Sequence, residues 1–276
     1  LDPARPTDAQ RHEIDEMQPS ITPLLKAWST HLETGPRGPA ILLDLSPRLS
    51  EEQRALVDAI LETSFPGTPR TWEWLSQGGG RIDRLSVWVG SISSLKPVRC
   101  VRMGRKKVMA TIEGSPRSSE ITKLNKPPPY GAWITILDPA LIQSGLHETW
   151  LEKVLHEDAG SSWLRMDGRR PLLISTEPLI IDEETEAFVI ASGEIVQHRL
   201  SPPELSTIQL VSDACERAGI GKVTLRCSLD PEIHPTLQRR LDKALKEVEG
   251  PRGFMVDLDL DRGSGSHTLY IVCREK

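Results

Sequence analysis

Three stretches of this chain share one pattern, an apolar strand that ends at a proline where a helix begins. The prolines are Pro47, Pro139 and Pro231, so the two intervals between them are both 92 residues. Each stretch reads leucine, then serine or aspartate, proline, any residue, and leucine or isoleucine. Serine and aspartate cap helices and proline suits the first helical turn, so the pattern predicts a strand followed directly by a helix. Such a period indicates a repeated fold unit, although coincidence is the alternative because this kind of helix start is common.

The segments around the three stretches extend the repeat. Apolar residues at helical spacing predict a leading helix before the first copy, over 21–32, and another before the third copy, over 205–215. Gly35 and Gly219 end these helices and lie twice the period apart. Strands that alternate with single helices and finish in hairpins are typical of an α/β sandwich. We therefore predict tandem ferredoxin-like or RRM-like units of the α+β class with mixed sheets.

These elements divide the chain into five predicted segments. The segments are a peripheral helical lead over 1–19, a first α/β unit over 20–112, a basic linker rich in proline, serine and lysine over 113–130, a second α/β unit over 131–200 and a third over 201–276. In the first unit we expect a loop between Pro66 and Gly80, and a helix with Leu56 and Ile60 on its buried face. In the second unit we expect one helix from Pro139 to about residue 158.

Charge and composition restrict the class of protein. The net charge is −5, with 38% apolar and 26% charged residues, so nucleic-acid binding would have to depend on a local cluster. The longest apolar runs span only a few residues, too few to cross a membrane. Cys100, Cys215, Cys227 and Cys273 lie far apart without a CxxC pair. This pattern is typical of reduced, buried thiols, and we predict an intracellular protein of the cytoplasm, the nucleus or an organelle.

The sharpest local feature is a basic stretch between residues 96 and 126, which carries only two carboxylates, Glu113 and Glu120. Its cations are Lys96, Arg99, Arg102, Arg105, Lys106, Lys107, Arg117, Lys123 and Lys126. A hairpin that turns at residues 104–107 would present such side chains to phosphate groups. We therefore predict a site for RNA or DNA here. An acidic surface of a protein partner and a plain solvated surface are the alternatives.

Three aspartates alternate with leucines in the last predicted hairpin. On a strand, Asp257, Asp259 and Asp261 would share one face, with Leu258 and Leu260 on the other. Carboxylates at this spacing can hold Mg²⁺ or Ca²⁺, but no glutamate follows at the position that closes a calcium loop. An exposed strand face is the simpler interpretation, so the three aspartates are weak metal candidates only.

A few aromatic residues indicate a second kind of contact. Trp72 and Trp74 stand in the predicted loop, and Tyr130 ends a Pro-Pro-Pro-Tyr stretch that matches the PPxY ligands of WW-type domains. Short proline-rich stretches also serve as rigid spacers. These three residues are candidate contacts for a protein partner.

Sequence patterns of known chemistry are absent. There is no P-loop, GxGxxG, GxSxG or HExxH pattern, and we predict no catalytic residue and no cofactor. The sequence favours a non-catalytic binding or scaffold subunit of a larger intracellular assembly that contacts RNA or DNA through the basic stretch. Two alternatives stay open. One is a protein–protein adaptor that uses Trp72 and Trp74, and the other is a metal-dependent phosphoryl-transfer enzyme that uses the three aspartates.

Overall fold

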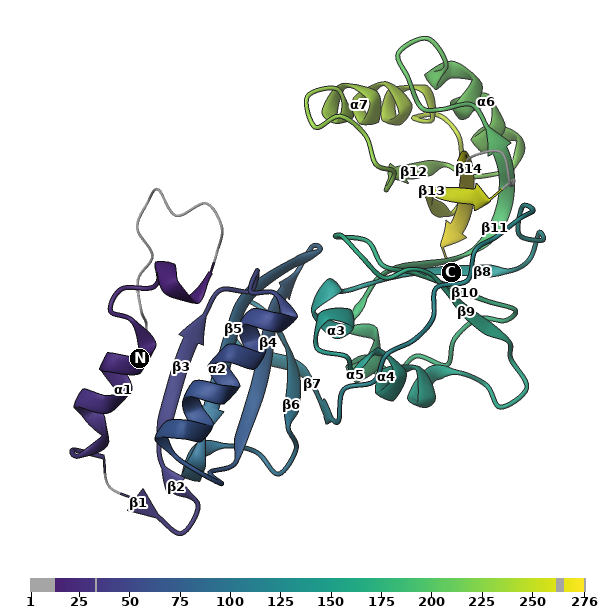
Figure 1. Cartoon of the computed structure of the whole chain (residues 1–276). Helices are drawn as coiled ribbons and strands as arrows, with labels where there is room; N and C mark the ends of the chain where they lie inside the picture. Colours follow the sequence, from purple (N-terminus) through teal and green to yellow (C-terminus); the bar gives the residue numbers. More distant parts are fainter. Residues whose placement is uncertain (1–12, 33, 262–265, 276) are drawn as a thin grey trace. The chain divides into compact units, whose positions relative to one another are not determined.

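The computed structural model describes residues 13–32, 34–261 and 266–275 (Figure 1). Most of the helical lead predicted over 1–19 lies outside these residues. The described part of it contains one short 3-10 helix, η1 (Ile14–Glu16).

The chain divides into two compact units whose segments alternate along the sequence. The first unit comprises Leu1–Ser118 and Ala140–Trp150, and the second comprises Ser119–Pro139 and Leu151–Lys276.

The first unit is built on a five-stranded mixed sheet. Its strands are β3 (Ile41–Leu45), β4 (Arg70–Gly78), β5 (Arg81–Val89), β6 (Val98–Met103) and β7 (Val108–Gly114). Their order across the sheet is β3-β5-β4-β6-β7, in which β4 and β6 run parallel and the other neighbours are antiparallel. The same unit contains the two-stranded ribbon β1 (Thr34–Gly35) and β2 (Gly38–Pro39) and the 3-10 helix η2 (Gly90–Ile92).

Helix α2 (Glu51–Ser64) lies across one face of this sheet, and α1 (Ile21–Ser29) contacts α2 (Figure 1). The Ser50 side chain caps α2 by accepting the backbone N–H of Gln53 at 3.2 Å. Val57 and Leu61 form its buried stripe, whereas Leu56 is 53% exposed. The prediction that Leu56 is buried is wrong because the apolar face of the helix follows Val57, one position further along.

The helix predicted from Pro139 to about residue 158 is interrupted. It consists of α3 (Pro139–Gln143) and α4 (His147–Val154). Gly145 lies between them with φ 71°, a left-handed conformation that glycine adopts without strain. A Cβ at this position would lie 2.7 Å from the Cβ of Pro116. The prediction of one continuous helix is wrong because this left-handed residue ends the first helical segment.

The second unit is built on a seven-stranded mixed sheet. Its strands are β8 (Trp133–Leu137), β9 (Ser161–Arg165), β10 (Leu172–Ser175), β11 (Val189–Leu200), β12 (Lys222–Leu225), β13 (Arg252–Asp261) and β14 (Ser266–Glu275). The order is β12-β13-β14-β11-β8-β10-β9, and β12 and β13 are parallel while the other neighbours are antiparallel. The helices of this unit are α5 (Glu183–Glu186), α6 (Ile208–Arg217) and α7 (His234–Ala244).

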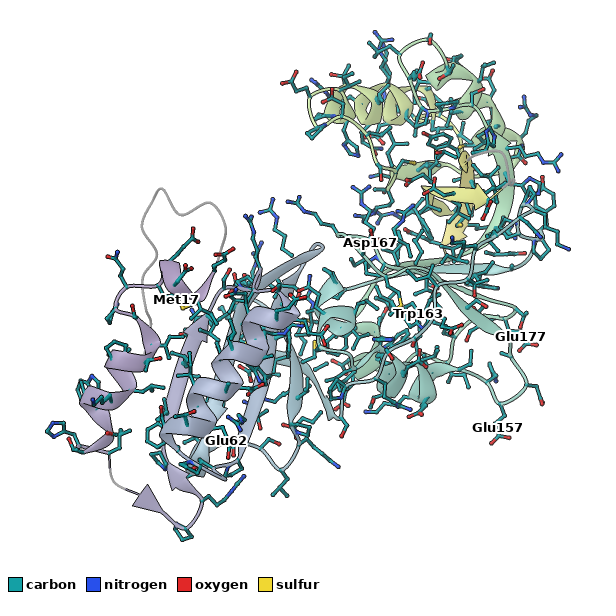
Figure 2. The ribbon with its side chains drawn as sticks, in the orientation of Figure 1. Met17, Glu62, Glu157, Trp163, Asp167 and Glu177 are labelled. Carbon is teal, nitrogen blue, oxygen red and sulfur yellow. The ribbon has the colours of Figure 1, made fainter. Side chains whose placement is uncertain are left out.

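The two faces of this sheet bury different apolar clusters. On one face, Ile136 of β8 belongs to the same buried cluster as Val256 of β13. On the other face, Met255 of β13 belongs to a cluster with residues of α6 and α7. Glu157 and Glu177 of the second unit project outward from the chain (Figure 2).

The structure confirms a mixed α/β architecture with two mixed sheets and seven α-helices among the described residues. It does not confirm tandem ferredoxin-like units with a 92-residue repeat. β3 pairs with β5 and β8 pairs with β10, so each contacts the second strand of the hairpin that follows it. β12 instead pairs with β13, the first strand of its hairpin. The three copies share an order of elements along the chain, but the third differs in strand pairing.

The cysteines and the helices bear on two further expectations from the sequence. All four cysteines are buried free thiols. Among the helices of the described residues, none combines the length and the apolar character that crossing a membrane requires.

Candidate functional site

The structure distributes the nine predicted nucleic-acid-binding residues over several places. Lys96 precedes β6, while Arg105, Lys106 and Lys107 follow it, so they lie at opposite ends of that strand. Six strand residues separate these ends by roughly 20 Å. Lys123 and Lys126 are exposed residues of the second unit. The nine residues therefore do not gather at one place, because the sheet separates residues that are close in sequence, and the RNA or DNA site stays a prediction.

The Arg99 side chain makes its contacts within the first unit. Its Nε lies 2.6 Å from Oε2 of Glu73 and its Nη1 lies 3.6 Å from Oε1 of Glu113. The guanidinium also lies over the ring of Trp88, at 5.0 Å from the ring centroid. Glu73 is only 8% exposed, so Arg99 compensates a buried carboxylate and is not available to a phosphate.

Arg117 also has contacts within the first unit. Its backbone N–H donates to the carbonyl of Gly145 at 2.8 Å, and its Nη2 donates to Oγ1 of Thr149 at 3.3 Å. These contacts connect the segment after β7 to the α3–α4 region.

The Arg102 side chain of β6 lies against the β4–β5 turn. β4 and β6 are parallel and Ser76 pairs with Arg102, so both strands end at the same edge of the sheet. The Arg102 guanidinium passes over Gly78, where an added Cβ would lie 2.0 Å from Nη2. Gly78 therefore permits the β4–β5 turn to lie directly beside the β6–β7 turn.

This arrangement places two further cations, Arg81 and Arg84 of β5, at the same end of the sheet as the β6–β7 turn. We call the resulting cluster the basic sheet end, and its members are Arg81, Arg84, Arg102, Arg105, Lys106 and Lys107. Two carboxylates lie in the same part of the sheet, Asp44 and Asp83, and Asp44 is 3.3 Å from Nη1 of Arg84. Sequence reasoning missed Arg81 and Arg84 because only the parallel β4–β6 pairing places them here.

The free cations of the basic sheet end are on its turns. Arg105, Lys106 and Lys107 are exposed, and no ion pair involves them among the residues that the structure describes. In the helix layer, the first turn of α2 carries Glu51 and Glu52. The cations of the β6–β7 turn are thus among those that have no ion pair within the described residues.

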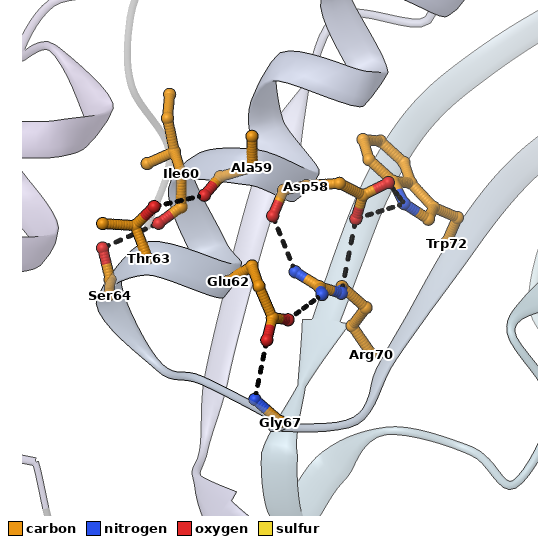
Figure 3. Close-up of polar contacts among 9 residues, drawn as sticks. All are labelled: Asp58, Ala59, Ile60, Glu62, Thr63, Ser64, Gly67, Arg70 and Trp72. Carbon is orange, nitrogen blue, oxygen red and sulfur yellow. Dashed lines mark hydrogen bonds and ion pairs between the residues drawn. The ribbon is translucent and has the colours of Figure 1, made fainter.

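Trp72 and Trp74 are not in a loop, because residues 70–78 form β4. Their exposed fractions are 8% and 4%. Trp72 Nε1 donates to Asp58 of α2 at 3.2 Å, and Asp58 also lies 3.4 Å from Nε of Arg70 (Figure 3). Burial raises the pKa of Asp58, while the Trp72 N–H and the Arg70 guanidinium act in the opposite direction. These tryptophans are internal, which removes the exposed surface that the adaptor alternative requires.

Trp72 and Trp74 also line a cavity of about 580 Å³ within the first unit. The Arg54 guanidinium lies over the Trp74 ring at 5.6 Å from the centroid. The third aromatic candidate, Tyr130, is 58% exposed and stacks on His198 with ring centroids 4.2 Å apart.

The three aspartates of β13 differ from one another in their surroundings. Asp257 is 7% exposed and lies 3.2 Å from Nη2 of Arg165, while Asp259 accepts a hydrogen bond from Thr268 at 3.2 Å. Both line a cavity of the second unit, whereas Asp261 is exposed and does not. Within the described part of the chain, no three His, Cys, Asp or Glu side chains are grouped as metal ligands would be. Asp257 is already neutralised, which weakens the metal-dependent alternative.

The buried cysteines are poor nucleophiles. Burial raises the pKa of Cys215 to about 12 and raises the pKa values of Cys227 and Cys273 further. Only a thiolate attacks readily, so these side chains act as small apolar residues of the core.

Comparison of the chain with protein-family models, with curated protein sequences and with solved structures gives no match.

Proposed function

We propose that this protein is a non-catalytic binding subunit of an intracellular assembly and that it contacts RNA or DNA through the basic sheet end. The observation that carries the proposal is the pairing of β4 with β6, which places Arg81 and Arg84 at the same end of the sheet as the exposed cations of residues 105–107. A local cluster of cations can attract phosphates even on a chain of net charge −5.

Binding at this site would read the phosphate backbone and not the bases. In the first unit, the Arg99 guanidinium lies over the ring of Trp88, and Trp72 and Trp74 are buried. Stacking on exposed aromatic rings is how proteins hold unpaired bases. The basic sheet end consists of arginine and lysine side chains alone, so affinity should depend strongly on salt and little on sequence.

The test is a salt series with fluorescently labelled RNA and DNA, each in single- and double-stranded form. Wild type is compared with a variant that carries Arg105→Ala, Lys106→Ala and Lys107→Ala. Each lost phosphate contact lowers the slope of log affinity against log salt by about 0.7–0.9, so the triple variant should lose about two to three in slope.

The control is a variant with the same change in charge elsewhere. Lys222, Lys243 and Lys246 are exposed residues of the second unit, and their replacement by alanine should leave the slope unchanged. Equal slopes for both variants would show that net charge, and not the basic sheet end, controls binding. Absence of binding at about 50 mM salt would exclude nucleic acid and favour an acidic protein partner.

We also infer that the strand–proline–helix stretches are related fold units. Support comes from the second copy, in which β8, β9, β10 and β11 take the order β11-β8-β10-β9 with all neighbours antiparallel. Helices separate β8 from β9 and β10 from β11. This order of elements supports the inference, because a ferredoxin-like unit also follows the order βαββαβ.

A further inference from the structure

A cavity of about 920 Å³ lies in the second unit, separate from the basic sheet end. This volume is within the range of sites that hold small molecules, about 300–1,000 Å³. Its lining comes from the β9–β10 loop, the β12–α7 loop and one face of the β13–β14 hairpin. These segments are far apart in sequence, so only the fold brings them together.

The floor of the cavity is a set of polar cross-strand neighbours. Asp257 pairs with Tyr270 and Asp259 pairs with Thr268 in the β13–β14 register, so all four side chains lie on one face. The intervening Leu258 is buried in the core on the other face. One face of β13 therefore presents polar side chains to the cavity, and its other face packs in the apolar core.

Two arginines fix the walls of the cavity, Arg165 against the floor and Arg170 against the β12–α7 segment. Arg165 Nη2 donates to the backbone carbonyl of Asp257 at 2.8 Å and to its Oδ2 at 3.2 Å. Asp257 Oδ1 accepts the backbone N–H of Ser228 at 3.1 Å, and Arg170 donates to the carbonyl of Cys227. The β9–β10 and β12–α7 loops are thus held in position without a ligand, which lowers the entropic cost of binding one.

Three donors that line the cavity are left without an acceptor among the residues that the structure describes. They are the exposed guanidinium of Arg169, the hydroxyl of Tyr270 and the hydroxyl of Ser228. Burial, together with nearby negative charge, raises the pKa of Tyr270, so its hydroxyl keeps its proton and can donate.

The charged side chains of the lining balance one another, because Arg165, Arg169 and Arg170 are matched by Asp167, Asp257 and Asp259. The cavity as a whole therefore does not attract anions, and an anionic group would depend on the local donors Arg169, Tyr270 and Ser228. Figure 2 shows Asp167 on the side of the second unit where the β9–β10 loop lies. The carboxylates that remain, Asp167 and Asp259, are acceptors suited to ligand hydroxyl groups.

We propose that this cavity binds a small hydroxylated organic phosphate. Arg169, Tyr270 and Ser228 hold the phosphate, and Asp259 with Thr268 contacts the hydroxyl groups. The site is distinct from the basic sheet end, so the two proposals can fail independently.

Isothermal titration calorimetry on the full chain tests this proposal. The probes are ribose 5-phosphate, glucose 6-phosphate and glycerol 3-phosphate, with ribose and inorganic phosphate as comparators. At least one ester should bind more tightly than either comparator. Arg169→Ala should weaken that binding at least about tenfold and Tyr270→Phe about threefold or more, because each removes a hydrogen bond to an anion.

Arg252→Ala is the matched control, because Arg252 is an exposed arginine of β13 outside the cavity. It should leave affinity unchanged, and near-ultraviolet circular dichroism should show that all variants keep the native fold. The proposal is overturned if none of the three esters binds at millimolar concentration. It is equally overturned if Arg169→Ala binds as wild type does, or if a comparator binds as tightly as the esters.

Discussion

His147 is a titratable group in the interior of the first unit, with an exposed fraction of 2%. Burial lowers its pKa, and Arg117 acts in the same direction, while Glu148 opposes them. The unfolded chain therefore binds more protons than the folded chain below the usual histidine pKa of about 6.5. Stability is complete above that pH and is lost as the pH falls through it. We expect the free energy of unfolding from urea titrations to decrease between pH 7.5 and 5.5, with a contribution from this residue of up to about 1.4 kcal/mol per pH unit.

Replacement of single histidines separates this contribution from the rest. His147→Gln should flatten the dependence of stability on pH, whatever its effect on absolute stability. His156→Gln is the control, because His156 is an exposed histidine and its replacement should leave the slope as it is in wild type. An unchanged slope in His147→Gln would contradict the assignment.

Buried polar residues explain why β4 is not visible in the sequence. Thr71 is fully buried and its hydroxyl donates to the carbonyl of Lys96 at 2.8 Å, while Glu73 pairs with Arg99. Such residues break the alternation of apolar and polar side chains by which a strand is identified. Their partners lie more than 20 positions away in sequence, so local pattern gives no sign that these groups are satisfied.

The left-handed Gly145 between α3 and α4 allows a direct test by substitution. Gly145→Ala places a Cβ 2.7 Å from Pro116 on a residue with φ 71°, so it adds a steric clash to backbone strain. Gly67→Ala is the matched comparison, because Gly67 has φ 67° and no atom within 4 Å of an added Cβ. A left-handed alanine costs about 1–2 kcal/mol. We expect Gly67→Ala to lose about that much stability and Gly145→Ala to lose clearly more, measured by urea unfolding. Equal losses would show that the Pro116 contact relaxes without cost.

Single elements were easier to predict than their pairing. The helices expected over 21–32 and 205–215 correspond to α1 and α6, and the turn expected at 104–107 lies between β6 and β7. The repeated leucine–proline pattern also indicated three strand-to-helix connections. It does not indicate which strand of the following hairpin will pair with the strand before the proline. Either strand can do so, because both choices bury the same apolar face. The basic sheet end and the cavity of the second unit depend on that choice, so neither could be derived in full from sequence.

The alternation of the two units along the chain predicts that the first one needs its distant segment. Residues 140–150 belong to the first unit, where the carbonyl of Gly145 accepts the N–H of Arg117 and the fully buried Leu146 lies close to Gly114. A fragment of residues 1–118 lacks these contacts. We expect it to be less stable than a fragment of residues 1–150 by at least about 2 kcal/mol, the contribution of one fully buried leucine.

A third fragment, residues 1–138, controls for added length, because it extends the chain without the 140–150 segment. It should unfold at the same urea concentration as residues 1–118 when followed by far-ultraviolet circular dichroism. Equal midpoints for all three fragments would mean that residues 1–118 fold without help from α3 and α4. A midpoint that rises only in the 1–150 fragment would show that residues 140–150 complete the first unit. It would follow that neither unit is formed by one continuous segment of the chain.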